Sequence, residues 1–169
     1  MNFKKNINIY LTVLFIILLC LNIFLLTRNK EVPSNEDYVN LYKSLIDDVM
    51  KEEKTLNKFN KYIAVDMDSF SLIEKNVEYE EMLIGHVYKY NDNVFISTYD
   101  KLEKKGYVNG GSLEGLFINS RIIKKNKYGN KIEIEISKYV APLGSYGISY
   151  KAIFKNGKWN LDKKSLFVS

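Results

Sequence analysis

The distribution of glycine and proline divides most of the chain into two stretches with different folding preferences. All nine glycines fall between Gly85 and Gly157, whereas Ser34 to Ile84 contains neither glycine nor proline. Because glycine and proline mark turns, the first stretch favours helices, and the second favours strands joined by turns. The sequence therefore predicts an α+β fold, with helical segments followed by a sheet.

The first stretch predicts a long helix over residues 36–62. Ser34 is the expected N-cap, and Asp37 follows it three residues later, as in a capping box. Apolar residues, Tyr38 and Tyr42 among them, then recur at spacings of three and four, which is the period of a helix with one buried face. We expect this face to pack on the sheet of the same chain. The alternative is a homodimer formed through the helix.

The C-terminal region has the period of two that is typical of strands. In "KIEIEIS", residues 131–137, isoleucines alternate with polar residues, which directs the isoleucines to a core. The turns "NKYGN" and "APLGS" flank this strand, and Asn156-Gly157 predicts a last tight turn. We expect the long helix to pack on a curved antiparallel sheet ending in a four-strand meander. Trp159 would fill the core between sheet and helix.

An uncharged apolar run of twenty residues, "INIYLTVLFIILLCLNIFLL", covers Ile7–Leu26. As a helix it would span about 30 Å, the thickness of a bilayer's hydrocarbon core. It is longer than the apolar region of a signal peptide, and no small-residue cleavage site follows it. The sequence thus predicts an N-terminal transmembrane helix acting as an uncleaved signal-anchor. Lipidation of Cys20 is the alternative.

This interpretation gives the chain four parts and a location. They are a cytoplasmic tail over 1–6, the anchor over 7–26, a linker over 27–34, and a single α+β domain over 35–169. The positive-inside rule places the lysine-containing tail in the cytoplasm. We therefore expect a single-pass protein of the cell membrane whose main domain is extracytoplasmic. Its expected partners are the membrane, through Ile7–Leu26, and a protein of the cell envelope.

The charge of the chain argues against a nucleic-acid partner. The chain has 25 Lys and Arg against 20 Asp and Glu, but four of the bases flank the apolar run. The remainder is thus nearly balanced, whereas a nucleic-acid binder needs a basic face that neutralises several phosphates. Metal and cofactor motifs are also absent from the sequence, since there is one histidine and the single cysteine lies within the apolar run. We expect no cofactor, no metal site and no catalytic residue.

Three side chains are candidate ligand-binding residues: His86, Tyr88 and Tyr150. His86 has an imidazole that titrates near neutrality, and we place it at the start of a strand, in a hairpin that turns at residues 91–93. The two tyrosines lie on expected strands and combine a large apolar ring with a polar tip, which suits a binding surface. Ordinary packing within the sheet is the alternative for all three residues.

The closing stretch "YKAIFKNGKWNLDKKSLF", after a long helix and irregular helical material, resembles the nuclear-transport-factor-2-like (cystatin-like) cone fold. The resemblance implies an extracytoplasmic domain behind a single anchor. Some relatives are enzymes with an acid or base in the cone, and others are catalytically silent scaffolds, including a membrane-anchored subunit of conjugation channels. No functional residue carries over to this chain.

From these observations we expect a membrane-tethered extracytoplasmic binding or scaffold domain without catalytic activity, acting with other cell-envelope proteins. Two alternatives stay open at this point. One is a small-ligand-binding or enzymatic cone-shaped domain, in which a polar group lies in a pocket of the sheet. The other is a partner protein of the immunity or inhibitor type.

Overall fold

The computed structural model describes residues 12–23, 31–58, 61–142 and 144–168. The chain divides into two compact units, with the boundary between Glu31 and Val32. The second unit contains the sheet, the longer helices and every side chain named below as part of a site.

The first unit corrects the prediction of an N-terminal transmembrane helix. Residues 12–23 are helical. Among the described residues, no helix is long and apolar enough to cross a membrane. The other residues of the predicted 7–26 span lie outside the described residues.

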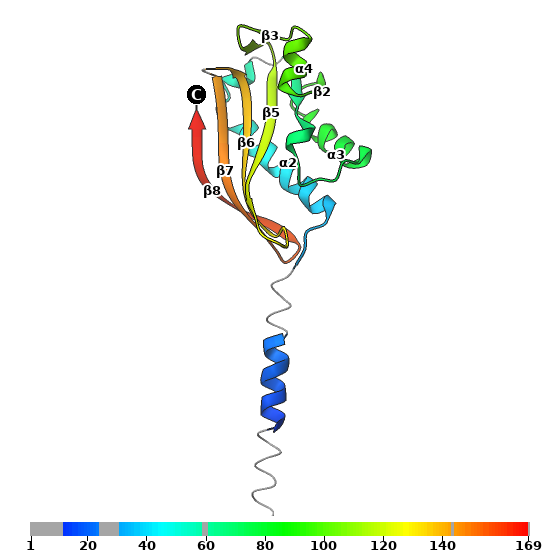
Figure 1. The fold of residues 1–169 in the computed structure, drawn as a ribbon. Helices are drawn as coiled ribbons and strands as arrows, with labels where there is room; N and C mark the ends of the chain where they lie inside the picture. Colours follow the sequence, from blue (N-terminus) through cyan, green and yellow to red (C-terminus); the bar gives the residue numbers. More distant parts are fainter. Residues whose placement is uncertain (1–11, 24–30, 59–60, 143, 169) are drawn as a thin grey trace, which may run out of the picture. The chain divides into compact units, whose positions relative to one another are not determined.

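The second unit confirms the α+β class and corrects the sheet, which is mixed and not antiparallel throughout. Six strands lie in the order β2-β1-β5-β6-β7-β8. The short strand β1 (Ile63–Val65) pairs in parallel with both β2 (Val94–Ile96) and β5 (Leu116–Lys125). Strands β5, β6 (Lys131–Ala141), β7 (Gly144–Lys155) and β8 (Lys158–Val168) follow one another as antiparallel neighbours (Figure 1).

Helix α2 (Asn35–Lys51) begins where the sequence indicates but ends earlier than predicted. The Ser34–Asp37 capping box is present at its start. The helix stops at Lys51 because Lys138 of β6, which is fully buried, donates to backbone and side-chain oxygens just beyond it. Its Nζ lies 2.6 Å from the carbonyl oxygen of Glu52 and 3.1 Å from that of Glu53. The single helix predicted over 36–62 is therefore wrong, and a separate short 3-10 helix covers Leu56–Lys58.

The hairpin predicted around residues 91–93 is also wrong, because its first arm is helix α3 (Val77–Val87). Asn76 caps the helix by accepting a hydrogen bond from the backbone N–H of Glu78 at 3.0 Å. The chain then passes into β2, which lies at the edge of the sheet. Helix α4 (Tyr99–Lys104) and the antiparallel pair β3 (Val108–Asn109) and β4 (Ser112–Leu113) connect β2 to the meander.

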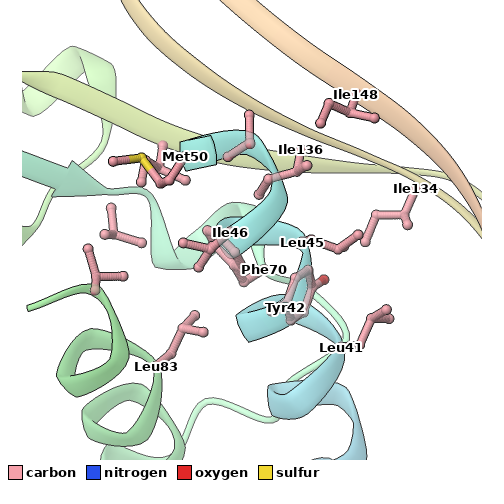
Figure 2. Close-up of a cluster of buried hydrophobic side chains, with 14 of the residues drawn as sticks. Leu41, Tyr42, Leu45, Ile46, Met50, Phe70, Leu83, Ile134, Ile136 and Ile148 are labelled. Atoms are coloured by element: carbon pink, nitrogen blue, oxygen red, sulfur yellow. The ribbon is translucent and has the colours of Figure 1, made fainter. Parts of the chain in front are cut away.

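A main core fills the space between the sheet and the helices α2 and α3 (Figure 2). The ring of Tyr42 packs edge-on against that of Phe70, with centroids 4.7 Å apart. Trp159 of β8 is partly buried against this core and donates its indole N–H to the carbonyl oxygen of Asp37 at 2.8 Å. The main core includes Leu41, Leu45, Ile46 and Val49 from α2, Leu83 and Val87 from α3, and Ile134, Ile136 and Ile148 from the sheet.

A second, smaller core follows from the alternation of side chains along β1 and β5. Ile63 and Val65 belong to the main core, whereas Ala64 between them belongs to the second one. Because successive side chains of a strand point to opposite faces, the second core lies on the other face of the sheet. Its buried members are Tyr62, Ala64, Leu102, Leu113 and Phe117.

Candidate functional site

His86 lies in the last turn of α3, and not at the start of a strand as predicted. Its Nε2 lies 2.6 Å from Oδ1 of Asp47, on the neighbouring helix α2. The same carboxylate oxygen accepts hydrogen bonds from Nζ of Lys89 at 2.5 Å and from the hydroxyl of Tyr90 at 2.8 Å. Nε2 of His86 is also 3.0 Å from Nζ of Lys89. When Nε2 carries the proton of the ring, Nε2 of His86 and Nζ of Lys89 both donate to Asp47.

The charge of Asp47 holds this network together. Burial alone would raise the pKa of the Asp47 carboxyl, but the hydrogen bonds from Lys89, Tyr90 and His86 outweigh it and hold the pKa below its ordinary value. No group of three metal-ligating side chains occurs in the described ranges of the chain. The contacts to Asp47 link α2 to His86 of α3 and to Lys89 and Tyr90 just beyond the end of α3.

Tyr150 lies in β7 and is closed to solvent, with 2 % of its surface exposed. Its hydroxyl donates to Oδ2 of Asp48 in α2 at 2.9 Å. Burial and this hydrogen bond to a carboxylate both raise the pKa of Tyr150, so the hydroxyl keeps its proton. In this position Tyr150 ties the sheet to the helix, and its hydroxyl already has a partner within the protein.

Tyr88 is the predicted site residue that lies at an open surface. It caps the C-terminus of α3, and 47 % of its surface is exposed. Its hydroxyl is 3.4 Å from the carbonyl oxygen of Val94 in β2, which it faces across the gap between helix and strand. The structure thus places His86, Tyr150 and Tyr88 in three different surroundings and does not bring them together in one pocket.

Tyr88 lines an open groove between α3 and β2, the α3–β2 groove, with a volume of about 520 Å³. The wall of the groove is largely apolar, and its apolar side chains are well exposed. The exposed fraction is 69 % for Val77 and 50 % for Ile96. Exposed apolar surface of this kind, rimmed by polar residues, is typical of an interaction site. The apolar lining consists of Val77, Ile84, Gly85, Tyr88 and Ile96.

Gly85 leaves the middle of the α3–β2 groove empty. A Cβ placed on Gly85 would meet no described atom within 4 Å, and its backbone is ordinary helix. Neither packing nor backbone geometry therefore requires glycine here, although glycine inside a helix costs about 1 kcal/mol relative to alanine. The missing side chain provides room on the outer face of α3 for a group from another molecule.

The charged side chains that line the α3–β2 groove are both acidic. Glu80 and Glu81 lie on α3 beside the apolar residues. No lysine or arginine from the described residues lines the groove with them. The site therefore presents apolar surface next to negative charge, which favours an occupant that carries apolar groups and positive charge.

The sequence contained a signal for this groove that the strand prediction obscured. Val77, Ile84 and Tyr88 recur at spacings of seven and four, so they share one face of a helix. Leu83 and Val87 form a second stripe, which is the one buried in the main core. Of the first stripe, Ile84 also packs against the main core, whereas Val77 and Tyr88 stay exposed and are available to a partner.

Comparison of the chain with protein-family models, with curated proteins and with solved structures finds no match. The resemblance to the nuclear-transport-factor-2-like cone fold therefore stays a prediction. An α+β fold of this kind is compatible with many functions, so the function has to be argued from the site itself.

Proposed function

We propose that this protein is a binding domain without catalytic activity that holds a segment of a protein partner in the α3–β2 groove. The observation that carries the proposal is the apolar groove itself, left open at Gly85 on a helix whose other face is buried. The predicted cell-envelope location and the identity of the partner stay predictions from the sequence.

The occupant of the groove is a peptide segment with apolar side chains next to lysine or arginine. Val77, Tyr88 and Ile96 supply exposed apolar area, and covering such area is the main driving force of association. Glu80 and Glu81 supply the complementary charge, which selects against acidic segments and accelerates association with basic ones. A side chain of the partner would enter the space above Gly85.

The groove is also held in place before the partner arrives. The hydrogen bonds and ion pairs of Asp47 with His86 and Lys89 fix α3 against α2, and the bond from Tyr88 to the Val94 carbonyl fixes the end of α3 against β2. A site that is already ordered loses less conformational entropy on binding. This rigidity supports recognition of a defined segment.

A selection from a displayed library of random peptides tests the proposal. The full chain is immobilised, and we expect the enriched peptides to combine aromatic or aliphatic residues with lysine or arginine. In Gly85→Trp the indole fills the groove and abolishes the enrichment, whereas Gly85→Ala, the matched control, retains it. Enrichment of the same peptides by Gly85→Trp, or of acidic peptides by the unaltered chain, would contradict the proposal.

A further inference from the structure

A second cavity of about 610 Å³, the β3–β4 cavity, lies beside the ribbon formed by β3 and β4. This volume falls within the range of about 300–1,000 Å³ that is typical of small-molecule sites. It shares no lining residue with the α3–β2 groove. Its lining includes the side chains of Tyr62, Lys105, Tyr107, Asn109, Ser112 and Glu114.

Tyr62 is the residue that sets this cavity apart. Its surface is 3 % exposed, and its hydroxyl has no hydrogen-bond partner in the described part of the chain. Leaving a buried hydroxyl without a partner costs about 1–3 kcal/mol. Burial raises the pKa of Tyr62, and electrostatic interactions with Tyr107 and Glu114, which both line the cavity, raise it further. Tyr62 thus lines the cavity with a hydroxyl that keeps its proton.

The ring of Tyr62 is held firmly, so the hydroxyl does not find a partner by moving. Its centroid is 5.3 Å from that of Phe95 and 5.2 Å from that of Tyr107, which it meets edge to face. Gly115 passes so close that a Cβ on it would lie 2.5 Å from the Tyr62 ring. Tyr107, at 43 % exposure, is the open side of this aromatic cluster.

The polar side chains around these rings supply both hydrogen-bond donors and acceptors. Lys105 donates, Glu114 accepts, and Asn109 and Ser112 do both. The two charges at the cavity have opposite sign, and Glu114 is already paired with Lys61 at 2.8 Å. Because Lys105 and Glu114 give the lining one charge of each sign, it matches a neutral ligand that both donates and accepts hydrogen bonds.

We propose that the β3–β4 cavity binds a neutral carbohydrate, with the hydroxyl of Tyr62 donating to a sugar oxygen. A sugar ring has an apolar face of C–H groups, which fits against an exposed tyrosine ring such as that of Tyr107. Its rim of hydroxyls both donates and accepts, which matches Asn109 and Ser112. A purely apolar ligand would leave these polar groups without partners, at a cost in affinity. This site is independent of the peptide groove.

The test uses the full chain and a panel of mono- and disaccharides built from glucose, mannose and N-acetylglucosamine, with binding measured by saturation-transfer NMR. We expect at least one sugar to bind with a millimolar or better dissociation constant, and Tyr62→Phe to weaken it about tenfold, as the loss of one hydrogen bond predicts. Gly85→Trp leaves sugar binding unchanged, so failure of the peptide groove and failure of this site are distinguishable.

Thermal unfolding of Tyr62→Phe without sugar shows whether the variant is as stable as the unaltered chain. Because the hydroxyl has no partner to lose, the variant should be as stable as the unaltered chain or more stable. Weakened sugar binding in a variant of undiminished stability supports the proposal. Absence of binding by every sugar of the panel, equal affinity in Tyr62→Phe, or a loss of stability in Tyr62→Phe would each overturn it.

Discussion

Lys138 is the residue that most directly fixes the boundaries of the elements around it. It is fully buried, although a lysine is rarely buried without partners. Its ammonium group donates to the Glu52 and Glu53 carbonyls and, at 2.8 Å, to Oδ1 of Asn57. Burial lowers the pKa of Lys138 to about 8, so the group is still mainly protonated at neutral pH. All three protons are then used to close the end of α2.

We predict that Lys138→Met lowers the free energy of unfolding by about 1–3 kcal/mol, because three acceptors lose their donor. Lys163→Met is the matched control. Lys163 is also paired with Glu52, at 2.9 Å, but it is 38 % exposed, and exposed pairs contribute about 0–1 kcal/mol. Urea denaturation of both variants measures the difference. Equal losses would mean that the buried lysine has no special role.

A second prediction at the residue scale concerns the effect of Gly85 on stability. Replacing it with alanine should raise the free energy of unfolding by about 1 kcal/mol, since the helix gains its better former and the new methyl group meets no neighbour. Thermal unfolding followed by circular dichroism measures the change. A destabilised Gly85→Ala would show that the helix needs glycine for its own packing, which would remove one support for the groove.

At the scale of elements, the Asp47 carboxylate adds polar contacts between α2 and α3 to their apolar packing in the main core. The native pKa of Asp47 lies below the ordinary value of 3.8, so the ionised group contributes stability above that pH. This contribution is lost as the pH falls through the native pKa. We therefore predict that Asp47→Asn is less stable than the unaltered chain at neutral pH, and that the difference shrinks towards about pH 3.

Urea denaturation at both pH values measures this effect, and Asp92→Asn, at an exposed aspartate, is the control. The control variant should follow the unaltered chain closely. A stability difference for Asp47→Asn that stays constant with pH would show that the carboxylate charge does not hold the two helices together.

The elements also differ in how far the sequence could predict them. The strands of the meander were predictable because Ile132, Ile134 and Ile136 alternate with polar residues, and a period of two has one structural meaning. The end of α2 was not, because it depends on Lys138, more than eighty residues away in the chain. The parallel strand β1 has three residues, too few to show any period.

The candidate site was only partly predictable for the same kind of reason. Tyr88 could be named from its chemistry, but His86 and Tyr150 were placed without knowledge of Asp47 and Asp48, the partners that tertiary structure gives them. Gly85 carries no side chain and hence no chemical signal. Its role in the groove follows from the open space around it, which only the structure shows.

At the scale of the whole molecule, buried and partly buried tyrosines determine the response to alkali. Burial raises the pKa of Tyr42, Tyr90, Tyr139 and Tyr150, that of Tyr139 to about 12, from an ordinary value of 10.0. The unfolded chain therefore releases these protons at lower pH than the native protein does. It follows that stability falls as the pH rises above about 10.

The ultraviolet absorbance of tyrosinate tests this prediction. A group of tyrosines should ionise near the ordinary pH, and a second group should ionise only together with unfolding, as followed by circular dichroism in the same samples. A single titration of all tyrosines, completed while the protein is still folded, would contradict the burial described here.

The proposal that the α3–β2 groove binds a peptide is tested most directly by amide hydrogen exchange of the full chain, with and without a peptide enriched in the display selection. We predict that added protection concentrates in α3 and β2, residues 77–96, and is absent in Gly85→Trp. Protection centred on β8, on the β3–β4 ribbon, or undiminished in Gly85→Trp would contradict the proposal.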